Sequence, residues 1–129
     1  MSSSITKEEF ESVAQHAFDS LPKDFTERVD NVHIVVEDTP NADALEKSGA
    51  GVNSLLGLYQ GIPLTARTTW YGSYPTVPDK ITLYQKNIEA VCSSREELEK
   101  RITEVLFHEL GHYFGMDERQ IQNAMRRFF

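Results

Sequence analysis

The segment 94–115 constrains the fold of this chain more than any other. Ser94 and Glu97 have the spacing of a capping box, which marks the first turn of a helix. Apolar residues then recur at helical spacing, and Gly115 follows where a helix C-terminus favours glycine. The sequence therefore predicts one long amphipathic helix, from Ser94 to about Phe114.

The end of this predicted helix carries two histidines that flank a glutamate. Residues four apart lie on one face of a helix, so His108 and His112 can both reach one metal ion. Zinc accepts imidazole nitrogens at about 2.0–2.1 Å in a tetrahedral arrangement. Glu109 would then lie beside the ion, where it can take a proton from bound water and deliver it to a leaving amine. The pattern predicts one zinc ion per chain, with Glu109 as the catalytic general base.

The helical wheel places this glutamate on the core-facing side. At 3.6 residues per turn, one stripe contains the following residues: Leu98, Ile102, Val105, Glu109 and His112. A carboxylate there is unfavourable unless it is paired or lies in a polar site. A metal site at the bottom of a cleft would provide such a polar environment for Glu109.

A catalytic zinc site needs a third protein ligand and a fourth position open to water. Gly115 ends the helix and lets the chain turn back towards the histidines. Glu118 stands ten residues after His108, the position of the third ligand in the longer motif HExxHxxGxxH/D. We therefore expect His108, His112 and Glu118 to hold the metal, with Asp117 as the other candidate for the third position.

The rest of the chain predicts an α+β layout in which a small sheet packs on helices. Further helices are expected at 6–21, 41–47 and 117–127, and strands at 32–36, 55–59 and 81–84. Residues 61–80 are rich in Pro, Gly, Thr and Tyr and are expected to form a long loop or an irregular hairpin, and long loops are often functional. The length of 129 residues fits one domain that covers 1–129.

Charge and cysteine content exclude several classes of function. The net charge of −7 argues against nucleic acid as the main partner, because phosphate binding needs clustered Lys and Arg. The single cysteine, Cys92, cannot form an intrachain disulfide, no apolar run is long enough to span a membrane, and the N-terminus lacks a signal-peptide pattern. We expect a cytoplasmic protein with no nucleic-acid or membrane partner, and the oligomeric state stays open.

Several other residues are candidates for the surroundings of the site. Arg67, Tyr71 and Tyr74 in the long loop could act as a second oxyanion donor, although each also suits plain loop packing. His33 is expected to be a half-buried strand residue. Met125 lies in the last predicted helix, so core packing is favoured over a methionine turn beneath the metal.

Blocks along nearly the whole chain carry a resemblance to a known family. They are Leu21-Pro22 followed by Phe25, then 35–38, 55–65, 78–84 and 108–118. In these blocks the chain resembles the small bacterial zincin-like metallopeptidases, sometimes described as minimal zincins. The last block is the most specific, and 55–65 is distinctive of this family among zincins.

The resemblance implies a minimal zincin-like fold with a truncated sheet and an active-site helix. It implies zinc held by His108, His112 and an acid after Gly115, with Glu109 as general base, and it implies no particular substrate. Members of the family commonly have aspartate at the third-ligand position, whereas this chain has an aspartate followed by a glutamate at 117–118.

The favoured hypothesis is a zinc-dependent peptidase that acts on a peptide or protein substrate, bound along an exposed sheet edge. A second hypothesis is a non-catalytic zinc-binding interaction module, whose site would be closed if both Asp117 and Glu118 were ligands. A third is a narrow regulatory protease with one cytoplasmic protein substrate, which would not cleave generic peptides.

Overall fold

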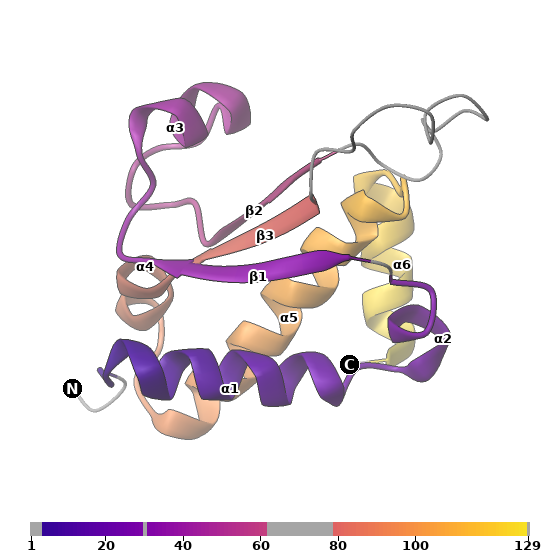
Figure 1. Ribbon diagram of the computed structural model, residues 1–129, viewed down its shortest axis with the longest axis horizontal. Coiled ribbons are helices and arrows are strands. Elements are labelled where there is room, and N and C mark those ends of the chain that lie inside the picture. The colour runs from indigo at the N-terminus through magenta and orange to yellow at the C-terminus, as the bar shows by residue number, and fades with distance from the viewer. Residues whose placement is uncertain (1–3, 30, 62–78, 129) are drawn as a thin grey trace.

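A three-stranded mixed sheet forms one layer of the molecule (Figure 1). The computed structural model describes residues 4–29, 31–61 and 79–128. The strand order is β1–β3–β2, in which β1 (Val32–Glu37) runs parallel to β3 (Asp79–Tyr84) and β2 (Gly57–Gln60) runs antiparallel to it. Among the described residues, β1 and β2 are therefore the edge strands.

Two helices form the second layer. The helices α1 (Lys7–Asp19) and α5 (Arg95–Tyr113) pack against each other, and α1 also contacts β1 while α5 contacts β2 and β3. The shared core is lined by side chains from both layers: Phe10, Val36, Ile81, Leu83, Leu98, Ile102, Leu106 and Leu110, among others. The predicted α+β fold, with a small sheet on helices, is confirmed.

The long helix α5 forms as its sequence predicts. The hydroxyl of Ser94 accepts a hydrogen bond from the backbone of Glu97 at 3.1 Å, while the Glu97 side chain reaches back to Ser93 rather than to Ser94. The predicted stripe is buried except at His112, which is partly exposed, and Gly115 follows the helix in the left-handed conformation, with φ of 80°. Because α5 starts and ends at defined residues, its last turn lies at a defined place against the sheet.

Two smaller helices lie at opposite ends of the molecule (Figure 1). At one end is α3 (Ala42–Ser48), close to the helix predicted at 41–47; Asn41 caps it, and Gly49 follows it in the left-handed conformation. At the other end α6 (Glu118–Phe128) follows α5 after a tight turn and packs back against it. This return brings the start of α6 to the last turns of α5.

The structure differs from the sequence-based expectation in its shortest elements. The helices α2 (Lys23–Thr26) and α4 (Gln85–Ala90) were not predicted, because so few residues show no helical period. The second strand begins two residues later than predicted, since the carbonyl of Leu55 accepts from the side chain of Asn87, at 2.8 Å, instead of joining the ladder. Within the described parts of the chain, no helix has the length and apolar character needed to cross a bilayer.

Candidate metal centre

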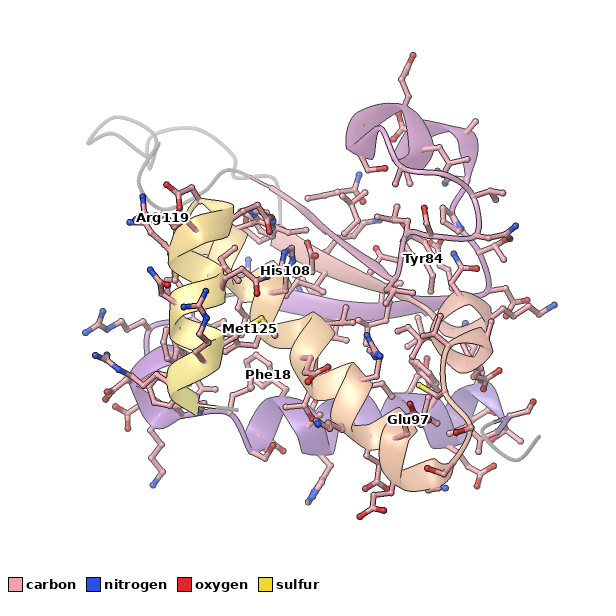
Figure 2. All side chains as sticks on the ribbon, turned by 180° about the vertical axis from the view of Figure 1, so that it is seen from behind. Phe18, Tyr84, Glu97, His108, Arg119 and Met125 are labelled. Carbon is pink, nitrogen blue, oxygen red and sulfur yellow. The ribbon has the colours of Figure 1, made fainter. Side chains whose placement is uncertain are left out.

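The two histidines of α5 converge on one carboxylate from α6. The Nε2 atom of His108 lies 2.9 Å from Oε1 of Glu118, and Nε2 of His112 lies 3.2 Å from Oε2 of the same residue. Figure 2 shows His108 beside the first turns of α6, whereas Arg119 points outward on the far side of that helix. All three side chains are at least partly exposed, so an ion could reach them from solvent.

The turn between the two helices explains why this carboxylate faces the histidines. Left-handed Gly115 reverses the chain, and the backbone N–H of Met116 donates to the carbonyl of Gly111 at 2.9 Å. Asp117 then caps α6, since its Oδ1 accepts from the backbone of Gln120 at 2.8 Å, and Gln120 bonds back to the Asp117 N–H. With Asp117 engaged at the cap, the next carboxylate, Glu118, is the one that meets both histidines.

The neighbouring carboxylate of Glu109 is held from the opposite side of α5. Glu109 is 7% exposed, and its Oε1 accepts a hydrogen bond from the backbone N–H of Tyr59 on β2 at 2.8 Å. Its Oε2 lies 3.0 Å from Nδ1 of His108. This buried carboxylate therefore has the polar partners that burial requires.

The electrostatics of the centre favour positive charge. Hydrogen bonding to Glu109, and then to Glu118, raises the pKa of His108 to about 9, although burial opposes the shift. The same contact with His108 lowers the pKa of Glu118. At neutral pH the metal-free centre thus holds a proton on His108 between two carboxylates, and a divalent cation would compete with that proton.

The donor set fits zinc. Ligand atoms of His108, Glu109 and His112 lie within 4.8 Å of one another. The two Nε2 atoms and the Glu118 carboxylate together give two imidazole nitrogens and one carboxylate, a set found in catalytic zinc sites that leave a fourth position for water.

Comparison with known proteins identifies the family. The sequence matches the profile of the zincin-like metallopeptidases over residues 29–127, a range that includes the whole centre. The chain belongs to the zincin-like metallopeptidase family. A comparison with curated proteins finds no match.

A solved structure shares the fold of this zincin-like chain. It is described as a conserved hypothetical protein (TTHA0227) from Thermo thermophilus, and it superposes with a TM-score of 0.53 at 22% sequence identity. The match covers 94% of this chain and 99% of that one. At this identity the likeness concerns the fold alone.

Two of the other candidate residues, His33 and Met125, lie outside the centre. His33 is exposed on β1, which β3 separates from β2, so the expectation of half-burial was wrong. Met125 is half-buried on α6 and packs against the core, which confirms the packing role over a methionine turn. The predicted loop donors Arg67, Tyr71 and Tyr74 lie outside the described residues.

Sequence reasoning missed the contribution of β2 to this zincin-like centre. A Cβ atom on Gly57 would lie 2.6 Å from Cγ1 of Val105 and 3.5 Å from Cγ of Glu109. The strand can approach α5 this closely because Gly57 has no side chain, and the approach brings the Tyr59 N–H to Glu109. A glycine inside a strand is a signal of close approach, so this contact had a readable trace in the sequence.

A groove of about 300 Å³ borders the centre between β2, α5 and α6. His108 and Glu109 line one part of it, and its apolar walls are formed by the following residues: Leu55, Leu56, Val105 and Met125. The groove therefore places an open, largely apolar surface next to the centre, alongside β2.

Proposed function

We propose that this zincin-like chain is a zinc-dependent peptidase that hydrolyses peptide bonds. The observation that carries the proposal is the convergence of two Nε2 atoms on one carboxylate, at 2.9 and 3.2 Å. In this proposal His108, His112 and Glu118 hold one zinc ion, and Glu109 is the general base. Membership of the family supports it.

The third ligand is assigned to Glu118 rather than to Asp117 on two grounds. The carboxylate of Glu118 contacts both histidines, whereas that of Asp117 accepts the backbone N–H of Gln120 and caps α6. An N-cap contributes about 1 kcal/mol to stability. If Asp117 bound the metal instead, this cap would be lost and the first turn of α6, which carries Glu118, would be destabilised.

Bound zinc would supply a water of lowered pKa and would polarise the scissile carbonyl. Glu109 is suited to handle the proton, because it adjoins the ligand His108 and a carboxylate has about four lone-pair positions. Two of these positions are used by Tyr59 and His108. The remaining ones can take a proton and pass it to the leaving amine.

The substrate in this proposal is an extended peptide that lies along β2 on the side away from β3. Among the residues that the structure describes, β2 is at an edge of the sheet, and edge strands bind extended peptides through main-chain hydrogen bonds. The Tyr59 N–H is already bonded to Glu109, so the peptide would pair with other backbone groups of the strand. The adjoining groove would receive a side chain next to the scissile bond.

One observation favours a second function, a zinc-binding interaction module without turnover. Both oxygens of Glu109 are bonded to donors of the chain itself, and the bond to Nδ1 of His108 would orient that ring as a metal ligand. In that function Glu109 would orient a ligand and would not move a proton. A narrow regulatory protease is a variant of the first function, with one protein substrate.

The test compares zinc-loaded wild type with Glu109→Gln and with the control Glu96→Gln, which alters a carboxylate in the first turn of α5. Each protein is assayed for zinc content and for cleavage of a fluorogenic peptide pool. The peptidase proposal expects one zinc per chain in all three, cleavage by wild type and control, and a loss of about 10²–10⁴-fold in Glu109→Gln.

Equal cleavage by Glu109→Gln would show that Glu109 is not the base. Zinc binding without cleavage of the pool is expected both for the interaction module and for a narrow regulatory protease, so it would count against a general peptidase only. Absence of zinc from the wild type would contradict both functions.

A further inference from the structure

A close contact between α5 and α6 lies directly beneath the candidate ligands. A Cβ atom on Gly111 would lie 2.5 Å from Cγ1 and 2.7 Å from Cδ1 of Ile121. Ile121 is fully buried, so its side chain fills the space that a residue other than glycine would occupy. Glycine destabilises a helix interior relative to alanine, and here it permits this contact.

The contact is placed where it can control the geometry of the ligands. Gly111 precedes His112 and lies within one turn of His108 on α5. Ile121 is three residues after Glu118, so the two side chains share a face of α6. The depth to which Ile121 enters α5 therefore sets the distance between the Glu118 carboxylate and the two imidazoles.

The candidate centre can tolerate only a small displacement of α6. An added Cβ at position 111 would need about 1 Å of separation to reach the 3.5–4.0 Å at which carbon atoms are in ordinary contact. Distances between zinc and its ligands are held within about 0.2 Å of their ideal values. A displacement of α6 by about 1 Å exceeds this tolerance, so it would disturb ligation by Glu118.

We infer that Gly111 and Ile121 form a positioning pair that sets α6 at the depth from which Glu118 can ligate a metal with His108 and His112. The inference rests on the proposed zinc site. It assigns no chemical role to either residue; their role is to hold a ligand in place.

The test exchanges side-chain volume between the two positions. Gly111→Ala should weaken zinc binding about 10–100-fold, as changes around a ligand do. Adding Ile121→Ala removes Cγ1 and Cδ1 and leaves Cβ, at 3.6 Å, as the nearest atom, so the double variant should regain affinity to within a few-fold of wild type. Affinity is measured by chelator competition, and the visible spectrum of the Co²⁺-substituted proteins reports the ligand geometry.

A matched control separates positioning from general stability. Ile88→Ala removes the same atoms from a fully buried isoleucine on α4. Combined with Gly111→Ala it should lower stability further and restore no affinity. If Gly111→Ala alone does not fold, the double variant still decides, because it should fold and bind zinc.

The metal-free proteins give a readout that does not depend on the proposed function. Nuclear Overhauser contacts from the Glu118 methylenes to the His108 and His112 rings should vanish in Gly111→Ala and return in the double variant. If wild type binds no zinc, the proposed function fails while these contacts still test the positioning pair. Unchanged affinity and contacts in Gly111→Ala, or a folded double variant without them, would overturn the inference.

Discussion

The two flanks of α5 reach the candidate centre in different ways. On the β2 flank a backbone N–H, that of Tyr59, holds the carboxylate of Glu109. On the α6 flank a side chain, that of Glu118, holds two histidines. Each flank comes close at a glycine, Gly57 on β2 and Gly111 on α5. In the proposed function, metal holding depends mainly on the α6 flank and proton handling on the β2 flank, and His108 is bonded to both carboxylates. Substitutions on each flank should show how far the two roles separate.

The largest effect is expected on the α6 flank, from Glu118→Ala. The variant removes the proposed third ligand, so zinc affinity should fall beyond the roughly 100-fold expected for residues around ligands. The control Asp117→Asn keeps a capping side chain and should bind zinc nearly as wild type does. Chelator competition measures both, and the reverse result would make Asp117 the third ligand.

The pH dependence of zinc binding should report the protonation of His108, which contacts Glu118 on the same flank. His108 must lose its proton to bind a metal, and its pKa in the metal-free protein is raised to about 9. Apparent affinity should therefore rise by about tenfold per pH unit up to pH 9, as expected for one released proton. Chelator-buffered titrations from pH 6.5 to 9.5 test this. A flat profile would show that His108 is not protonated between its two carboxylates.

The same pKa makes the metal-free fold sensitive to alkali. The folded pKa of His108 exceeds that of the unfolded chain, about 6.5. Its stabilising contribution is therefore complete below pH 6.5 and is lost as pH rises through 9. Urea unfolding of metal-free wild type should show this decline, and His108→Gln should remove it. This result would show that His108 links the two flanks, because Glu109 and Glu118 both contact its imidazole.

A smaller effect is expected on the β2 flank, from Gly57→Ala. Its Cβ would lie 2.6 Å from Cγ1 of Val105, so β2 must move away from α5. The free energy of unfolding should fall by about 1–3 kcal/mol, and turnover should fall because Glu109 loses the Tyr59 N–H. Zinc affinity should fall much less than in Glu118→Ala, because all three proposed ligands remain.

The control for this prediction is Gly51→Ala, whose nearest neighbour, Oγ of Ser54, would lie at an ordinary 3.4 Å. Urea unfolding, cleavage and chelator competition are measured on both variants. If Gly57→Ala loses zinc as Glu118→Ala is expected to, the two flanks are coupled and the comparison fails.

The smallest effect is expected from Tyr59→Phe. This change removes the hydroxyl that donates to Oδ1 of Asp79 at 2.8 Å and keeps the backbone N–H that bonds Glu109. Stability should fall by about 1 kcal/mol, with zinc affinity and turnover almost unchanged. A loss of turnover as large as that of Glu109→Gln would assign the hydroxyl, rather than the N–H, to the centre.

The α6 flank could be predicted from sequence because its contacts are local. The spacing of His108 and His112 follows from helix geometry, and Gly115 marks the reversal that returns the chain. The sequence also contains a feature that distinguishes Asp117 from Glu118. An acidic residue three positions before Gln120 has the spacing of a helix cap, and the structure shows that cap.

The β2 flank could not be predicted in the same way. The strand order and the contact between Tyr59 and Glu109 join segments 50 residues apart, and local periodicity says nothing of such pairs. The start of β2 was misplaced because Asn87, from another element, takes the carbonyl of Leu55. Helices as short as α2 and α4 have no readable period.

The tight turn at Gly115 also bears on the order in which the molecule assembles. The contact between His108 and Glu118 closes a loop of 10 residues, whereas that between Tyr59 and Glu109 closes one of 50. By chain entropy alone the longer closure is less favourable by about 1.4 kcal/mol. The hairpin of α5 and α6 can thus bring His108, His112 and Glu118 together before the sheet is complete, and β2 would then arrive to bond Glu109. In the proposed function, opening of β2 in the native protein, measured by hydrogen exchange at Tyr59, would leave a metal-holding hairpin without a positioned general base.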